Sequence, residues 1–218
     1  MNLNACIDHT LLKNTAIKEN FDKLIKEAYL REFYSVCIPP SWVSYCINRS
    51  VPVCSVASFS LGYSLLKTKV QEIEDLFNEG CSEVDVVLNY SALKSGDWSI
   101  VSQELKAFHE ISKTQTVKVI VESGMLESNE LNKLCDLFND YPSTYIKTST
   151  GFMEEGAVLE HVKLMRQKLS KDIKIKASGG IRNQEQAIAF IEAGASRLGT
   201  SAGVLIVTGD NSESSSTY

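Results

Sequence analysis

The feature that most constrains this chain is the alternation of two hydrophobic periods along its whole length. Eight short β-branched runs are typical of buried strands, and helical spacing of apolar residues separates most of them. The expected strands cover residues 5–9, 34–39, 53–59, 83–89, 117–122, 145–150, 173–178 and 197–201. Strands that alternate with helices predict parallel pairing through right-handed crossovers.

Eight such units predict an α/β fold of the TIM-barrel type, a single (β/α)8 barrel, and 218 residues is an ordinary size for it. The alternative is an open doubly wound sheet, but no expected strand is followed by G-x-G-x-x-G. No linker or repeat divides the chain. We expect a short N-terminal lead-in, one catalytic barrel over residues 1–208 and a flexible, serine-rich C-terminal tail over 209–218.

Composition excludes several classes of function. The net charge of −5 is spread without a basic run, so no nucleic-acid partner is expected. No apolar stretch is long enough to span a bilayer, and the N-terminus does not resemble a signal peptide, so no membrane partner is expected. The six cysteines are scattered without a C-x-x-C, a spacing that indicates neither a zinc site nor a disulfide framework. We expect a reduced, cytoplasmic protein.

Two lysines in strand-like runs are the first sign of chemistry. Lys147 lies in YIKTST and Lys176 in KIKAS, and a buried ammonium ion is usually paired or deprotonated. One interpretation is that both lysines form structural ion pairs with Asp85 and Glu122. The other is that a second cation frees one amine as a nucleophile toward a carbonyl, with Asp85 moving protons. Working residues of such a barrel gather at the carboxyl ends of its strands, which favours the second interpretation.

Glycines follow the last two expected strands. Gly179 and Gly180 come after the seventh strand, and Gly199 ends the eighth. The loops after strands seven and eight commonly bind phosphate in these barrels through backbone N–H groups, although simple turns would also explain glycines. A carbonyl-attacking lysine facing a phosphate site predicts a small sugar phosphate as substrate.

Six segments carry a resemblance to a known family. They are IDHTLLK at 7–13, EVDVVLNYSALKSGD at 83–97, VKVIVES at 117–123, KTSTGF at 147–152, KASGGIR at 176–182 and RLGTSAG at 197–203. The chain resembles the deoxyribose-phosphate aldolases, which are class I aldolases, along nearly its whole length. The resemblance implies reversible cleavage of 2-deoxy-D-ribose 5-phosphate to acetaldehyde and D-glyceraldehyde 3-phosphate in deoxyribonucleoside catabolism. It also implies that neither a metal nor an organic cofactor is used, and that the chain forms a homodimer.

The resemblance also assigns roles to residues. Lys147 would form the Schiff base, with Lys176 as the second lysine that depresses its pKa. Asp85 would be the proton-transferring carboxylate, and Asp8 would support the lysine network. The terminal Tyr218 matches a tail tyrosine that assists proton transfer in some members. The phosphate-loop positions of the family fall on Gly151, Gly179, Gly180, Arg182, Gly199 and Ser201.

One departure from the family pattern bears on the site. Lys174 has the same strand parity as Lys176, so it should share its face and would need an acidic partner or an exit to solvent at the bottom of the barrel. Two rival functions remain open at this point. One is a sugar-phosphate isomerase or epimerase that uses acid–base groups alone, and the other is a sugar-phosphate sensor without turnover.

Overall fold

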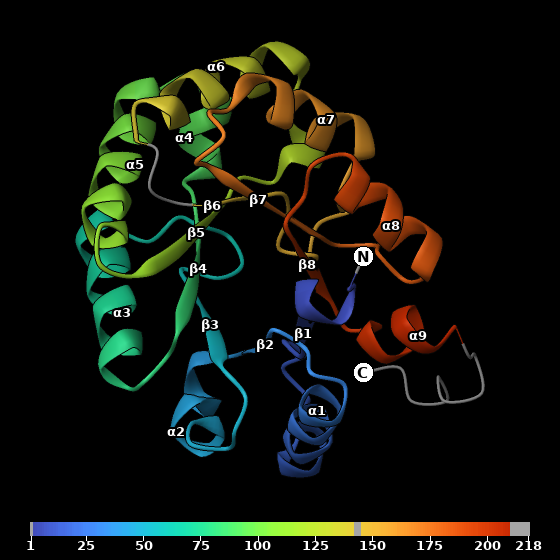
Figure 1. Ribbon diagram of the computed structural model, residues 1–218. Helices are drawn as coiled ribbons and strands as arrows, with labels where there is room; N and C mark the ends of the chain where they lie inside the picture. The colour runs from blue at the N-terminus through green and yellow to red at the C-terminus, as the bar shows by residue number, and fades with distance from the viewer. Residues whose placement is uncertain (1, 142–144, 210–218) are drawn as a thin grey trace.

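Eight parallel strands close into one barrel in sequence order in the computed structural model, which describes residues 2–141 and 145–209 (Figure 1). The strands are β1 (Ile7–Thr10), β2 (Ser35–Ile38), β3 (Val53–Ala57), β4 (Glu83–Val87), β5 (Thr116–Ile120), β6 (Tyr145–Lys147), β7 (Lys174–Ser178) and β8 (Arg197–Thr200). Every expected strand is confirmed. The first begins two residues later than predicted, because Asn4–Cys6 forms a 3-10 turn, η1, before it.

Helices surround the barrel (Figure 1). They are α1 (Lys18–Leu30), α2 (Val43–Cys46), α3 (Leu66–Asn78), α4 (Tyr90–Lys94), α5 (Trp98–Ser112), α6 (Ser128–Asn139), α7 (Leu159–Lys168), α8 (Gln184–Glu192) and α9 (Gly203–Thr208), with 3-10 turns η2 (Pro40–Trp42) and η3 (Ser123–Met125). No helix of the described residues is both long and apolar enough to cross a membrane.

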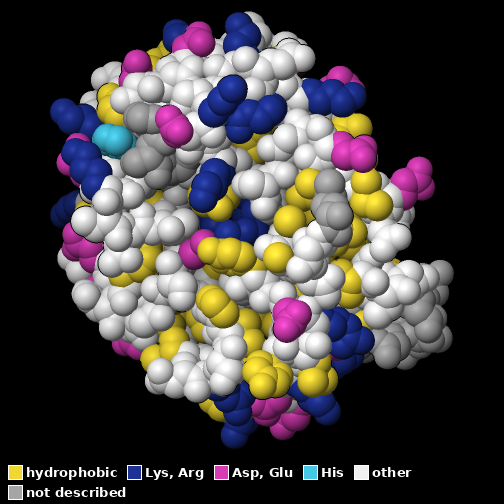
Figure 2. All heavy atoms as spheres, viewed as in Figure 1, with side chains coloured by type: hydrophobic (Ala, Val, Ile, Leu, Met, Phe, Trp, Pro, Cys, Tyr) yellow, Lys and Arg dark blue, Asp and Glu magenta, His cyan; other side chains and the backbone are white. Residues whose placement is uncertain are grey.

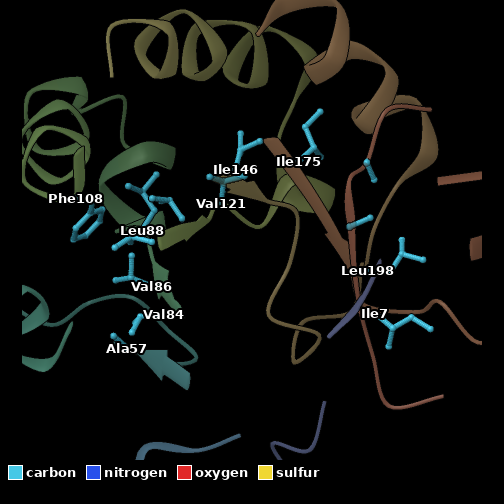
Figure 3. Packing of buried hydrophobic residues seen from close by; sticks show 14 of the residues in the cluster. Ile7, Ala57, Val84, Val86, Leu88, Phe108, Val121, Ile146, Ile175 and Leu198 are labelled. Carbon is cyan, nitrogen blue, oxygen red and sulfur yellow. The ribbon is translucent and has the colours of Figure 1, made fainter. Parts of the chain in front are cut away.

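The hydrophobic core lies between the strands and this ring of helices. Side chains of alternate strand residues, such as Val84, Val86 and Ile175, point outward and are fully buried (Figure 3). The helices cover them with the apolar stripes that the sequence predicts. In α1, for example, the stripe is Phe21, Leu24, Ile25 and Ala28.

Glycines end two of these helices. Gly80 follows α3 with a φ of 105°, and Gly194 follows α8 with a φ of 109°. Residues other than glycine rarely adopt this left-handed backbone conformation. Each glycine therefore lets the chain turn sharply into the next strand.

Many of the inward-facing strand residues are charged, whereas most of the outward-facing ones are apolar. Figure 2 shows Lys and Arg side chains at the centre of the viewed face, where the ring of strands lies in Figure 1. Charged side chains therefore line much of the barrel axis, and most of the apolar core lies in the outer layer.

Candidate active site

Seven charged side chains from six strands meet inside the barrel. Each is at most 4% exposed, and the set comprises Asp8, Glu83, Asp85, Lys118, Lys147, Lys176 and Arg197. The strand register brings them together, since Asp85 is the β4 neighbour of Lys118 in β5, and Lys147 is the β6 neighbour of Lys176 in β7. Burial of this many charges is tolerated only where they pair.

Asp85 is the centre of this network. Its Oδ2 accepts hydrogen bonds from Lys147 Nζ and Lys176 Nζ, both at 2.7 Å, and its Oδ1 accepts one from Lys118 Nζ at 2.8 Å. Burial by itself would raise the pKa of Asp85, but the three ammonium groups outweigh burial and hold that pKa well below its ordinary value. The carboxylate is therefore ionised throughout the physiological range.

Asp8 and Glu83 complete the network on the side away from Lys147. Asp8 lies 2.5 Å from Lys176 Nζ and 2.8 Å from Arg197 Nη1, and Glu83 lies 2.6 Å from Lys118 Nζ. Burial lowers the pKa of Lys118 and of Lys176, but the neighbouring carboxylates outweigh it, so both values lie above the ordinary lysine value. Both lysines are firmly protonated.

Lys147 differs from the other two lysines in its number of acidic partners. Among the residues that the structure describes, Lys118 and Lys176 each pair with two carboxylates, whereas Lys147 pairs with Asp85 alone. The network contains one more basic side chain than carboxylates. Lys147 can therefore leave Asp85 to react without leaving any of the three carboxylates unpaired, and an amine is a group that attacks a carbonyl.

A cavity of about 290 Å³ opens above Lys147. Lys147 forms part of its wall, and all six residues predicted to bind phosphate line it, namely Gly151, Gly179, Gly180, Arg182, Gly199 and Ser201. Lys13, Leu12 and Phe152, which the sequence did not single out, also line it. One cavity therefore joins the central lysine to the glycine loops after β6, β7 and β8.

Two of these loops approach each other closely at glycines. A Cβ atom added to Gly156 would lie 2.4 Å from the backbone oxygen of Gly179, and one added to Gly179 would lie 2.9 Å from Gly156 Cα. Gly179 also has a φ of 89°. The two loops therefore meet backbone against backbone at Gly179, which also lines the cavity, and a position of this kind requires glycine.

Comparison with known proteins identifies the family. A family model described as DeoC/LacD family aldolase matches residues 4–208. The chain belongs to the DeoC/LacD family of aldolases. It is 45% identical to the deoxyribose-phosphate aldolase of Streptococcus uberis over 96% of this chain and 97% of that protein, and 45% identical to that of Brevibacillus brevis over 96% of both. Its fold matches a tetrameric deoxyribose phosphate aldolase from Aeropyrum pernix with a TM-score of 0.85 and 29% identity, over 97% of this chain and 92% of that one.

Lys118, rather than Lys174, is the third lysine inside the barrel of this aldolase. Lys174 has the predicted parity, but it is exposed at the start of β7, where its Nζ lies 5.4 Å from the centre of the Tyr145 ring. The Lys174 side chain therefore reaches solvent at the bottom of the barrel, which is one of the two outcomes that the sequence predicted. Strand parity was the available signal for Lys118, because it alternates with the outward-facing Val117 and Val119.

Exchange of these two lysines for methionine should separate their roles in the aldolase. We expect Lys174→Met to keep aldolase activity within about twofold of the wild-type value. Substitution of an exposed surface residue usually changes the free energy of unfolding very little. Lys118→Met leaves Glu83 and Asp85 each short of a buried cation, so we expect a loss of about 3 kcal/mol in the free energy of unfolding. Denaturant unfolding and steady-state activity measure the two effects. Equal damage from both substitutions would contradict this assignment.

Glu122 does not pair with the lysines, and that part of the structural interpretation is wrong. Its Oε1 accepts a hydrogen bond at 2.8 Å from the backbone N–H of Thr150, and its backbone is left-handed with a φ of 49°. Burial raises the pKa of Glu122 above its ordinary value, although the hydrogen bonds from Thr150 oppose the shift. The side chain holds the loop after β6 against the end of β5. Tyr218 and residues 210–217 of the predicted tail lie outside the described residues.

Proposed function

We propose that this aldolase reversibly cleaves 2-deoxy-D-ribose 5-phosphate to acetaldehyde and D-glyceraldehyde 3-phosphate through a Schiff base on Lys147. The observation that carries the proposal is the shared cavity, in which Lys147 faces the glycine loops after β6, β7 and β8. The relatives from Streptococcus uberis and Brevibacillus brevis bear the name of this activity. A role in the catabolism of deoxyribonucleosides follows from that substrate.

The steps follow from the chemistry of an amine beside a carboxylate. The neutral amine of Lys147 adds to the aldehyde carbon C1 of the open-chain sugar, and loss of water gives an iminium ion. Asp85, acting through a water molecule, accepts the proton of the C3 hydroxyl. The C2–C3 bond then breaks, its electron pair moves into the iminium, and glyceraldehyde 3-phosphate leaves. The remaining enamine takes up a proton at C2, and hydrolysis releases acetaldehyde and the amine.

The other charged residues act on Lys147 and Asp85. Lys176 and Lys118 share the Asp85 carboxylate with Lys147, so two further positive charges lie beside the proposed nucleophile. Asp8 keeps Lys176 in place at 2.5 Å. Tyr218 is proposed as an additional proton-transfer group that the tail delivers to the site.

Arg182 is proposed to bind the substrate phosphate together with the backbone of Gly180 and the Ser201 hydroxyl. It lines the cavity at its exposed edge. We expect Arg182→Ala to raise KM for the phosphorylated sugar about tenfold, the effect of losing roughly 1.4 kcal/mol of binding free energy. Neither kcat nor activity on unphosphorylated deoxyribose should change much. Arg49→Ala, at a surface ion pair with Asp22, is the matched control. An equal loss on both sugars would argue against a phosphate contact.

Chemical trapping tests the proposed function. Incubation with deoxyribose 5-phosphate or acetaldehyde and borohydride should add one reduced two-carbon or five-carbon adduct per chain, and peptide mapping should locate it on Lys147. Turnover without any adduct would favour an isomerase or epimerase. Binding of the sugar phosphate without adduct or turnover would favour a sensor. Either result contradicts the Schiff-base aldolase.

We further propose that the aldolase is a cytoplasmic homodimer. The six cysteines are unpaired in the structure and five of them are buried, as expected in a reducing compartment. The relative from Aeropyrum pernix is a tetramer, so assembly varies among related proteins. Light scattering on the purified chain measures its own state.

A further inference from the structure

Two threonine hydroxyls tie together the loops at the glycine end of the cavity, and the proposed reaction uses neither of them. Thr148 directly follows Lys147 at the end of β6, and Thr200 ends β8. β7 lies between these two strands in the barrel (Figure 1). The side chain of Thr148 is fully buried, and that of Thr200 is 6% exposed. Their hydroxyls bond to the residues on either side of the Gly179–Gly180 pair that follows β7.

Thr148 joins the strand that carries Lys147 to the glycine loop after β7. Its Oγ1 donates a hydrogen bond to the backbone oxygen of Ser178 and accepts one from the backbone N–H of Ser178, both at 3.0 Å. The backbone oxygen of Thr148 accepts from Ser123 N at 2.8 Å, on the side of β5. The Thr148 side chain therefore takes the place of backbone in pairing β6 with the end of β7. Because Gly179 directly follows Ser178, one threonine connects the nucleophile to the glycine loop.

Thr200 holds the other side of the same loop. Its Oγ1 donates to the backbone oxygen of Ile181 at 2.8 Å and accepts from Ala202 N at 2.9 Å. A Cβ atom added to Gly199 would lie 2.9 Å from Ser178 Cβ, so β8 lies directly against the end of β7. The loops after β7 and β8 are thus fixed to each other as well as to β6.

We propose that Thr148 and Thr200 are positioning residues, through which binding of the substrate phosphate holds the aldehyde carbon against Lys147. The inference rests on the proposed function, in which the phosphate occupies the end of the cavity that the glycine loops line. The carbon chain of the substrate limits the distance between its phosphate and C1. A loop that binds the phosphate therefore fixes the place of C1 only if the loop is itself fixed relative to Lys147.

The two hydroxyls decide how the binding energy of the phosphate is used. The phosphate does not react, so contacts with a loosely held loop would lower KM without raising kcat. A loop that is rigidly joined to the nucleophile uses the same contacts to orient C1. Orientation matters steeply, since a misplacement of about 1 Å can lower the rate about 100-fold. Loss of a hydroxyl should therefore affect kcat, and only for a phosphorylated substrate.

Thr148→Val tests the first of these links, because valine keeps the shape of threonine and lacks its hydroxyl. We expect kcat on deoxyribose 5-phosphate to fall about tenfold or more, with KM within about threefold of the wild-type value. The kcat/KM on unphosphorylated deoxyribose should stay within about twofold of the wild-type value. This pattern is the reverse of that expected for Arg182→Ala, which raises KM. Thr148→Ser keeps the hydroxyl and should restore kcat, and Thr200→Val should lower kcat in the same selective way.

Ser55→Ala is the matched control for loss of a buried hydroxyl. Ser55 Oγ donates to the backbone oxygen of Ile38 at 2.9 Å and ties β3 to β2, on the opposite side of the barrel. This substitution should leave the preference for the phosphorylated sugar unchanged, even if it lowers Tm. The ratio of the two activities on one preparation does not depend on the fraction of folded protein. Borohydride trapping with acetaldehyde, which carries no phosphate, should proceed at the wild-type rate in all of these variants.

Several outcomes would overturn the proposal. Equal losses on the two sugars in Thr148→Val would show structural damage alone, and a higher KM with unchanged kcat would show a role in phosphate binding alone. If Thr148→Val does not fold, the same ratio measured on Thr200→Val decides. A wild type that cleaves both sugars equally well would refute the coupling and leave the aldolase reaction standing. A wild type that forms no adduct on Lys147 would instead refute the proposed function.

Discussion

Lys147→Arg is expected to eliminate turnover while leaving the barrel folded. Arginine keeps the positive charge that pairs with Asp85 at 2.7 Å, but its guanidinium forms no Schiff base with an aldehyde at neutral pH. We expect kcat to fall by about 10⁴-fold or more, the order of loss that follows removal of a covalent nucleophile. Borohydride with acetaldehyde should add no mass at this position.

Lys163→Arg is the matched control for that substitution. Lys163 is about half exposed on α7 and pairs with Glu160, so the same change of side chain should leave activity and adduct formation intact. Activity retained by Lys147→Arg would exclude a covalent role for this lysine. It would then favour acid–base chemistry of the isomerase type.

Asp85→Asn is expected to damage stability and chemistry together. Three lysines at 2.7–2.8 Å would face a neutral amide in place of a carboxylate that is fully buried. Removal of one partner from a buried ion pair costs about 3–5 kcal/mol, which lowers Tm by about 10 °C in a protein of this size. Loss of the proton acceptor should lower kcat by about 10²–10⁴-fold as well.

Thermal unfolding and kinetics on the same preparation measure both effects of Asp85→Asn. Asp136→Asn, at an exposed site in α6, should change neither. Assays well below the reduced Tm separate the loss of chemistry from the loss of folded protein. Full activity in folded Asp85→Asn would remove this carboxylate from the proposed mechanism.

The barrel and much of its site could be predicted from local sequence. Apolar residues repeat about every two positions in strands and every 3.6 positions in helices. These periods predict the eight strands and the apolar faces of the helices from the sequence alone. Parallel strands then bring their carboxyl ends together, which placed Lys147, Lys176 and Asp85 at one point. The glycine loops share a cavity for the same reason.

The features of the site that the sequence did not predict depend on which residues of different strands are neighbours. Lys118 has the inward parity, but its position opposite Asp85 depends on the register of β4 and β5. Cys37 and Cys54 are far apart in the sequence, and the pairing of β2 with β3 makes them neighbours. One interpretation of the sequence paired Glu122 with a lysine. In the structure its backbone is left-handed, and its carboxylate accepts a hydrogen bond from the backbone N–H of Thr150 instead.

The close approach of Gly156 and Gly179 sets a boundary for engineering this enzyme toward new aldehydes. Randomising either position would yield mostly misfolded variants, because any side chain meets backbone atoms at 2.4–2.9 Å. Phe152 borders the same cavity and is 55% exposed, and Phe59 packs edge-on against it at a ring distance of 5.1 Å. A library that varies this aromatic pair and leaves the two glycines alone would explore substrate range while preserving the folded barrel.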